Sequence, residues 1–264
     1  MNKFAFGKNW QRYLKIHNPK RLEVAKKSIT DFMGIENLKG KLFLDVGCGS
    51  GYFSLAAVQL GADVISFDVD PDCIKCCQFF KEKAGNPDNW QIYRGSILNK
   101  KFLSKLPQAD VVYSHGVLHH TGNMWQAMEN IKFLVKDNGY LYIAIYNTMY
   151  GLFNGSKAWR RKKQIYNRLP RILQYLYEGL YILRHSILPN LMRFRNPVKY
   201  LRNHYRKRGE SYLVDLRDWL GGYPYEYARP DELFNFYKNE FTLVNLLTKN
   251  TLALNVFLFL KNNK

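Results

Sequence analysis

Cysteine is scarce in this sequence, and its spacing excludes the common metal and disulfide frameworks. Only four cysteines occur among 264 residues: Cys48, Cys73, Cys76 and Cys77. A C-x-x-C-C cluster without a second ligand pair at finger-like spacing does not make a structural zinc site. We therefore expect no bound metal, and we interpret the cysteines as helix-packing residues of a reduced, cytoplasmic protein.

Long apolar runs are also missing. The most apolar stretch, residues 172–192, is interrupted by Glu178, Arg184, His185 and Pro189. No run of about 18 apolar residues therefore remains to span a membrane. The amino-terminal sequence MNKFAFGKNWQRYLKIHN has no apolar core of the kind found in secretory signals. We expect neither a spanning helix nor such a leader.

Acidic side chains are few relative to basic ones. The chain has 21 Asp and Glu against 40 Lys and Arg, for a formal net charge of +19. Such an excess indicates an anionic partner, which could be nucleic acid, lipid headgroups, or a phosphorylated or carboxylated metabolite. The hydrophobic share of 47% and the charged share of 23% are those of a globular chain rather than a disordered one.

Helical and strand-like segments alternate from about residue 20 to residue 150. Helices are predicted at 19–34, 52–61, 71–85 and 124–139, and strands at 41–47, 63–69, 90–97, 110–117 and 140–147. This alternation implies right-handed βαβ units and a mostly parallel sheet. Two further strands, at 241–248 and 252–260, are expected to form a closing hairpin.

The composition changes near residue 150. Between residues 151 and 210 about 15 Lys and Arg face only two acidic residues, and aromatic side chains are interleaved with them. The segment has helical periodicity, with breaks expected at Pro170, Pro189 and Pro197. We interpret 151–220 as a helical, basic cap that is inserted into a core made of 1–150 and 221–264.

Three glycines follow the first predicted strand in the sequence KLFLDVGCGSG. Gly47, Gly49 and Gly51 would let the backbone turn sharply and pass close to a ligand where Cβ atoms would collide. The next helix would direct its free N–H groups at that ligand. Asp68 ends the second strand, where a carboxylate can accept hydrogen bonds from a ribose diol. The spacing alone is a weak signal, because NAD-binding proteins use a related loop.

The surrounding motifs indicate which cofactor the glycine loop binds. LDVGCGSG is very similar to motif I of the class I S-adenosylmethionine-dependent methyltransferases, and FDVD is similar to that family's ribose-binding strand end. The segment from SHGVLHH to AIYN resembles its later motifs, so the resemblance covers roughly 38–147 and the terminal hairpin. It implies a Rossmann-like, seven-stranded α/β sheet with an antiparallel last strand, and S-adenosyl-L-methionine as the cofactor.

The resemblance also implies roles for residues of the loop. The glycines Gly47, Gly49 and Gly51 would line the methionine part of the cofactor, together with Cys48. Asp45 would lie near the cofactor's amino group.

Further cofactor contacts are implied beyond the loop. Asp68 would bind the ribose hydroxyls, and Val69 would contact the adenine. Ser96 stands where the family usually has an acidic residue for the adenine amino group. His115 and Gly116 would contact the methionine portion. An aromatic residue in FGKNWQRY, Trp10, would close over the cofactor or else pack on the core.

A hydroxyl acceptor needs a base that removes its proton, while alignment of the reacting atoms supplies much of the rate. His119 and His120 follow the fourth strand at the rim where such sheets bind ligands, and we prefer His119 as the base. Their alternative role is to cap or orient the next helix. Asp218 is a further candidate for the base.

The basic cap admits three explanations. Arg160, Arg161 and Arg208 could clamp a phosphate or carboxylate of a small metabolite, with Tyr223 and Tyr225 lining the pocket. The cap could instead lie on an anionic membrane or contact RNA phosphates. We favour the clamp, because the insertion follows the fifth strand, where such families build lids. Nucleic acid is not expected, since no RNA-binding module accompanies the core.

The cap and the stretch DLRDWLGGYPYEYA resemble a subgroup of small-molecule methyltransferases linked to quinone, polyketide or surface-sugar pathways. We therefore predict methyl transfer to a hydroxyl of a small anionic metabolite. The leading candidate is a nucleotide-linked or phosphorylated sugar of a surface polysaccharide pathway. The alternatives are a phenolic lipid or quinone at a membrane surface, RNA, and a non-catalytic partner protein with the same fold.

Overall fold

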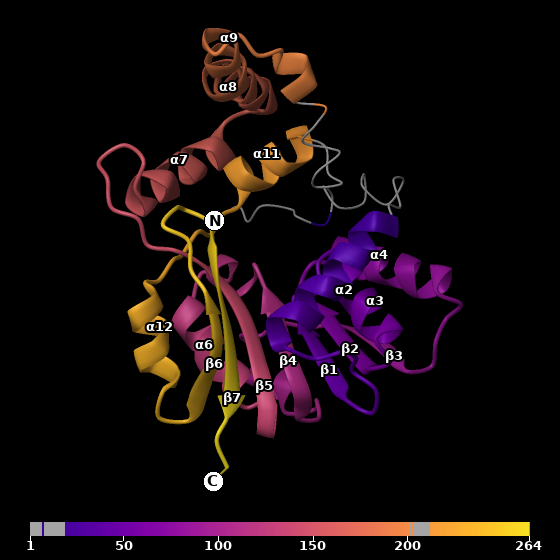
Figure 1. Cartoon of the computed structure of the whole chain (residues 1–264). Helices are drawn as coiled ribbons and strands as arrows, with labels where there is room; N and C mark the ends of the chain where they lie inside the picture. Colours follow the sequence, from indigo (N-terminus) through magenta and orange to yellow (C-terminus); the bar gives the residue numbers. More distant parts are fainter. Residues whose placement is uncertain (1–6, 8–18, 201, 203–211, 264) are drawn as a thin grey trace.

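A seven-stranded sheet forms the centre of the computed structural model, which describes residues 7, 19–200, 202 and 212–263. The strand order is β3-β2-β1-β4-β5-β7-β6 (Figure 1). The strands are β1 (Leu42–Val46), β2 (Asp63–Asp68), β3 (Trp90–Arg94), β4 (Ala109–His115), β5 (Val135–Tyr146), β6 (Phe241–Leu247) and β7 (Leu254–Lys261). The first five strands pair in parallel, whereas β7 runs antiparallel to β5 and β6. The predicted sheet with an antiparallel last strand is confirmed.

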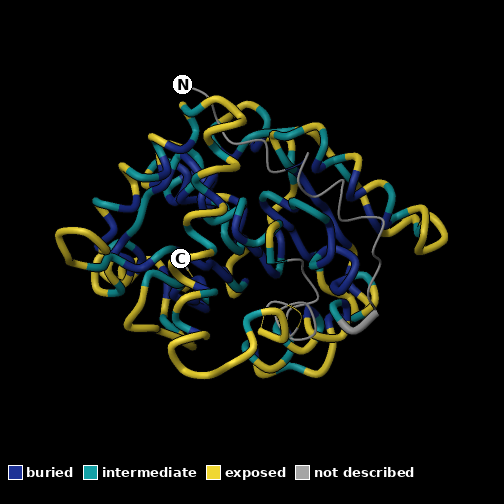
Figure 2. Tube along the Cα trace, turned by 90° about the horizontal axis from the view of Figure 1, so that it is seen from above, coloured by how far each residue is buried: buried dark blue, intermediate teal, exposed yellow. Residues whose placement is uncertain are grey.

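Helices cover both faces of the sheet, which explains why the central parallel strands β1, β2 and β4 are mostly buried. One face carries α2 (Pro19–Met33), α3 (Tyr52–Gln59) and α4 (Pro71–Lys83), and the other carries α5 (Lys100–Leu103), α6 (Met124–Lys132) and α12 (Pro230–Tyr237). Alternate residues of β1 point to opposite faces of the sheet. Phe43 packs in the core beneath α2, α3 and α4, and Leu44 packs in the core beneath α5, α6 and α12. Figure 2 shows the buried residues gathered in the interior of the molecule.

The prediction of a helix over 124–139 is wrong in its second half. α6 ends at Lys132, and β5 begins at Val135, which pairs with Ala109. Asn138 has a left-handed φ of 59°, and a Cβ on Gly139 would lie 2.7 Å from the Lys136 carbonyl oxygen. The strand register also shifts here. Residues 136–139 therefore form a bulge within the strand rather than the end of a helix.

The segment expected as the cap consists of helices beyond one end of the sheet (Figure 1). They are α7 (Ser156–Arg168), α8 (Arg171–Ile182), the π-helix η2 (Leu183–Ile187), α9 (Leu188–Met192) and α11 (Tyr212–Gly221). Their aromatic core includes Trp159, Tyr166 and Tyr225. Arg217 donates two hydrogen bonds to Glu178 Oε2, at 3.0 and 2.9 Å, and so ties α11 to α8.

The expected break at Pro189 is also wrong, because α8, η2 and α9 follow one another without a gap from Arg171 to Met192. Pro189 lies in the first turn of α9, directly after the π-helix. Proline has no backbone N–H to donate. Because a π-helical turn is wider than an α-helical one, the backbone before Pro189 accommodates the proline without ending the helical run. None of the described helices has the length and apolar character needed to cross a membrane.

Candidate active site

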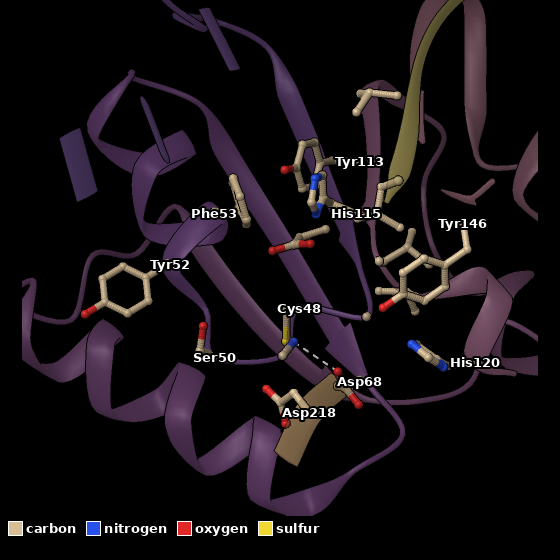
Figure 3. Close-up of a pocket in the computed structure, with 18 of the residues that line it drawn as sticks. Cys48, Ser50, Tyr52, Phe53, Asp68, Tyr113, His115, His120, Tyr146 and Asp218 are labelled. Carbon is tan, nitrogen blue, oxygen red and sulfur yellow. Dashed lines mark hydrogen bonds between the residues drawn. The ribbon is translucent and has the colours of Figure 1, made fainter. Parts of the chain in front are cut away.

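A cavity of about 1700 Å³ opens at the carboxyl ends of the parallel strands (Figure 3). Its walls come from the glycine loop after β1, from the ends of β2, β4 and β5, and from cap residues on α8 and α11. The sheet order reverses between β1 and β4, and ligands of open α/β sheets bind in the crevice at that point. The cavity is therefore the candidate site.

The glycine loop adopts a backbone that other residues tolerate poorly. Gly47 has a φ of 77°, and a Cβ added there would collide with the Val117 side chain. Gly51, with a φ of 84°, is the N-cap of α3, and a Cβ there would approach Cys77 to 3.0 Å. Gly47, Cys48 and Gly49 line the cavity, whereas Gly51 lies behind it. The loop thus brings its backbone close to any occupant of the cavity.

Asp68 is fixed by the loop that it faces. Its Oδ2 accepts a hydrogen bond from Gly49 N at 3.0 Å, and its Oδ1 accepts one from Asp70 N at 2.9 Å (Figure 3). A carboxylate has about four acceptor sites, so oxygen lone pairs remain for a diol. Val69 and Ser96 line the same part of the cavity. Ser96 Oγ already accepts a hydrogen bond from Leu98 N at 3.2 Å.

Asp45 lies at the base of the cavity and belongs to a buried hydrogen-bonded chain. Ser54 Oγ donates to Asp45 Oδ2 at 2.6 Å, Ser66 Oγ donates to Ser54 Oγ at 2.8 Å, and Trp90 Nε1 donates to Ser66 Oγ at 2.9 Å. Burial, with a smaller contribution from Asp68, raises the pKa of Asp45 to about 7. Asp45 is thus a carboxyl group that a bound cation would ionise fully.

The three supporting residues were not anticipated from the sequence. Ser54 lies on α3, and Ser66 and Trp90 lie on neighbouring strands, so only the folded sheet brings them together.

Aromatic side chains form another wall of the cavity. The rings of Tyr113 and Tyr142 lie 4.5 Å apart, and the ring of Phe53 lies 4.9 Å from that of Tyr113. His115 stacks on Tyr113 at 6.2 Å, and its neighbour Gly116 also lines the cavity. Burial lowers the pKa of His115 to about 4, so its imidazole is neutral near pH 7. This wall is aromatic and uncharged near pH 7.

The adjacent histidines occupy different environments. His120 lines the cavity, and its Nδ1 lies 2.5 Å from the Pro224 carbonyl oxygen. A carbonyl only accepts hydrogen bonds, so Nδ1 carries the proton and Nε2 carries the lone pair. Burial lowers the pKa of His120 to about 3.

His119 is fully buried and does not line the cavity. Its ring lies 4.2 Å from that of Tyr146, and neither ring nitrogen has a hydrogen-bond partner among the described residues. The geometry reverses our preference between the two histidines and favours His120.

The expected substrate residues are only partly brought together. Asp218 and Tyr223 line the cavity, whereas Tyr225 is buried beside Tyr146 at a ring distance of 4.9 Å. Arg160 and Arg161 are exposed on α7 and do not line the cavity. Arg208 and Trp10 lie outside the described residues. The described structure therefore does not bring the proposed arginine clamp to this site.

Charge in the cavity has the opposite sign to that of the whole chain. The described acidic residues that line the cavity are Asp31, Asp45, Asp68, Asp70, Asp215 and Asp218, and the basic ones are Arg21 and Lys249. Asp215 and Asp218 project from α11 of the cap, opposite the glycine loop. None of the basic residues described in the segment 151–200 lines the cavity.

Lys163 is a buried cation behind this wall. Its Nζ donates a hydrogen bond to the Trp219 carbonyl oxygen and lies 4.0 Å from the Trp219 ring centroid. Burial lowers the pKa of Lys163 to about 7, although the nearby Asp218 carboxylate opposes this shift. The sequence pattern identifies this lysine only as one of the basic residues of the cap. Trp219 and Asp218 both line the cavity, whereas Lys163 does not. Lys163 therefore contacts the Trp219 part of the cavity wall from within the protein interior.

Comparison with known proteins relates the chain to methyltransferases. A family model described as a methyltransferase domain matches residues 37–207. The ribosomal protein L11 methyltransferase of Tolumonas auensis is 34% identical over 109 residues, which are 41% of this chain and 35% of that protein. The tRNA U34 carboxymethyltransferase of Aeromonas hydrophila is 34% identical over 111 residues, 41% and 33% of the two chains. The matched segment therefore spans about a third of the length of these curated relatives.

Solved structures give a longer match at lower identity. Magnesium protoporphyrin IX methyltransferase from Synechocystis, solved with bound SAH, has a TM-score of 0.55 at 14% identity and covers 97% of this chain and 94% of its own. An N-methyltransferase of Bradyrhizobium japonicum has a TM-score of 0.53 at 12% identity, covering 98% and 100%. At such identities the likeness concerns the fold. Together with the family match, it confirms the resemblance inferred from the glycine motif.

Proposed function

The chain belongs to the methyltransferase domain family, with the class I fold and S-adenosyl-L-methionine as its cofactor, and we propose that it methylates a hydroxyl of a small molecule held in the cavity. One observation carries this proposal: a single cavity joins the glycine loop, Asp45 and Asp68 to the polar and aromatic side chains of the cap. Cofactor and acceptor can thus lie side by side between sheet and cap.

The residues of the first half of the cavity fit the cofactor. The absence of Cβ atoms at Gly47 and Gly49 leaves the loop backbone exposed to a ligand. The ionised carboxylate of Asp45 would hold the ammonium group, and the remaining acceptor sites of Asp68 would hold the ribose hydroxyls. Val69 and Ser96 would flank the adenine.

The chain's own contribution to the chemistry is alignment and proton removal. When bound, the cofactor supplies an electrophilic methyl group on a positively charged sulfur. His120 presents the Nε2 lone pair to the acceptor hydroxyl, because Pro224 holds its Nδ1 proton. With a pKa of about 3, His120 acts first as a hydrogen-bond acceptor that orients the hydroxyl. It takes the proton as the new oxygen–carbon bond makes the hydroxyl strongly acidic.

The lining favours an acceptor that is neutral or cationic and carries a ring. Asp215 and Asp218 would repel an anion, and among the described lining residues only Arg21 and Lys249 could pair with a phosphate. Trp219, together with other aromatic residues of the cap, offers faces on which a ring can stack. A nucleotide-linked or phosphorylated sugar, our leading candidate from the sequence, is therefore less well supported.

A methyl-transfer screen tests the acceptor class. The full chain is incubated with methyl-labelled cofactor and separate panels of neutral hydroxylated rings, amine-bearing hydroxylated rings, sugar nucleotides, phenolic lipids and total RNA, and product masses are measured. We expect label on oxygen in one of the first two panels, and loss of that label in Asp218→Asn if the acceptor is cationic. Label confined to sugar nucleotides or to RNA would contradict the proposed acceptor.

A further inference from the structure

The helical run from Arg171 to Met192 exposes many of its apolar side chains to solvent. We name as the outer face the side chains Ile172, Leu176, Leu180, Leu191, Met192 and Phe194, whose exposed fractions range from 53% to 101%. An exposed apolar group of this size on a soluble surface usually marks an interaction site. The outer face therefore requires an explanation.

The inward side of the same helical run combines buried polar residues with Tyr177, Tyr181 and Ile182, which pack on the aromatic core of the cap. Glu178 accepts hydrogen bonds from Arg217 and from Tyr166 Oη, the latter at 2.8 Å. Ser186 Oγ lies 2.5 Å from Tyr212 Oη, and Asn190 Nδ2 donates to the Ser186 carbonyl oxygen at 2.6 Å. The most buried residues of the run, Glu178, Ser186 and Asn190, are thus polar, whereas several of its apolar residues are exposed, which is unusual for a helix of a soluble protein. The bonds to Tyr166, Arg217 and Tyr212, which lie on other helices, fix which side of the run faces outward.

The π-helix η2 keeps the two faces aligned along the whole run. An α-helix advances 100° per residue, and a π-helical turn accommodates one extra residue. With that residue allowed for, Leu191 returns to the side of Ile172 and Leu176, and Asn190 stays on the side of Glu178. A regular α-helix would rotate the α9 leucines away from those of α8. The inserted residue therefore makes the outer face continuous along α8 and α9.

Charge beside the outer face is of one sign. Arg171, Arg184, Arg193 and Arg195 are exposed on or next to the run, and the only acidic residue between 151 and 200 is Glu178, which is buried in its pair with Arg217. Phe194 is fully exposed and has a left-handed φ of 53°, an uncommon conformation for a bulky residue. Aliphatic side chains rimmed by arginine match the boundary between acyl chains and anionic headgroups.

We propose that the outer face docks on an anionic lipid surface, with the helical run lying along it. Apart from Phe194, the side chains of the outer face are aliphatic and offer no planes for stacking bases, so the face fits single-stranded RNA poorly. A second copy would bring like charges together across the contact. Tyr181, on the inward side of α8, lines the cavity. Docking would therefore place the cavity about one helix diameter, roughly 10 Å, from the lipid.

Vesicle co-sedimentation of the full chain tests the proposal. We expect binding to vesicles containing phosphatidylglycerol and little binding to pure phosphatidylcholine. Leu176→Gln with Leu191→Gln should weaken binding at least about tenfold, because two apolar side chains leave the lipid. The matched control, Phe133→Gln with Val244→Gln, alters exposed apolar residues of the core, 62% and 50% exposed, and should bind as the parent does.

A second pair of variants separates local charge from net charge. Arg193→Gln with Arg195→Gln should reduce binding to anionic vesicles about 30-fold, since each basic residue near such a surface is worth about fivefold. Lys101→Gln with Lys105→Gln removes the same charge from an exposed part of the core and should have little effect. Equal losses in both pairs, or no vesicle binding by the parent chain, would overturn the proposal. Self-association without vesicles that the leucine variants abolish would overturn it in favour of a second copy.

Discussion

The Asp45 carboxyl, whose pKa burial raises to about 7, makes cofactor binding dependent on pH. The cofactor's ammonium group stays protonated below pH 7 and pairs with the ionised carboxylate. As pH falls from 7 to 5, a growing fraction of Asp45 is protonated, so the affinity should fall up to about tenfold per pH unit. Calorimetric titration across this range checks the slope. Asp45→Asn should bind weakly with little slope, and a steep slope in that variant would assign the effect to another group.

The same carboxyl should reduce the stability of the cofactor-free protein near neutral pH. Its folded pKa of about 7 exceeds its ordinary value of 3.8, so the folded state binds the proton more tightly. Its stabilising contribution is fully present below pH 4 and is lost as pH rises to 7. Asp45→Asn should therefore raise the melting temperature at pH 8 and do so much less at pH 4. A lower melting temperature at pH 8 would mean that the hydrogen bond from Ser54 outweighs the cost of burying the charge.

The two histidines should respond differently to substitution. His120→Asn replaces the imidazole with an amide that cannot take up the acceptor's proton, and it should lower kcat about 10²–10³-fold while leaving cofactor affinity nearly unchanged. His119→Asn changes a buried ring that packs on Tyr146, so its main effect should be on the melting temperature. Steady-state kinetics and thermal melts of both variants check this. A large kcat loss in His119→Asn at full stability would reassign the base.

At the scale of the elements, the Glu178–Arg217 pair should hold α8 against α11. Glu178 is buried, and Arg217 is about a fifth exposed, at 4% and 21% of their side-chain surfaces. Arg217→Met would leave the carboxylate buried without its cation, which costs about 3–5 kcal/mol in a fully buried pair and somewhat less here. Urea unfolding should show a loss of about 2–3 kcal/mol. Glu178→Gln with Arg217→Met should recover part of it, and an unchanged midpoint in the single variant would contradict the role.

Strand and helix positions followed from periodicity where both faces of the sheet are covered. The prediction failed at 136–139, because a strand bulge with a left-handed Asn138 has the same local sequence signal as a helix end. It failed again at Pro189, since the π-helix that accommodates the proline has no sequence signature. Local signals thus located the elements and missed their irregular turns.

The buried side of α7 could have been found from the sequence. Trp159, Lys163 and Tyr166 are spaced i, i+4 and i+7, and all three are buried. That spacing places Arg160 and Arg161 off the buried stripe, and the structure has them exposed. Considering the lysine as part of the stripe would have identified it as a buried cation.

At the scale of the whole molecule, composition predicted an anionic partner but not its location. The sequence motifs located the glycine loop and Asp68, because they lie at strand ends that the parallel topology brings together. The direction in which each cap residue points depends on how the helices pack. Amino-acid composition does not determine that packing. Most of the charged residues described in the cavity lining are acidic, whereas the outer face is apolar and has arginines beside it.

Calorimetric titration of the folded chain with S-adenosylmethionine tests the central claim most directly. We predict one binding site per chain, with the affinity in Asp68→Ala reduced about 10- to 150-fold by loss of the charge-assisted hydrogen bonds to the ribose. Lys105→Ala, a substitution on the exposed core surface, should bind as the parent does. Absence of binding by the well-folded parent chain, or equal affinity in Asp68→Ala, would contradict the account.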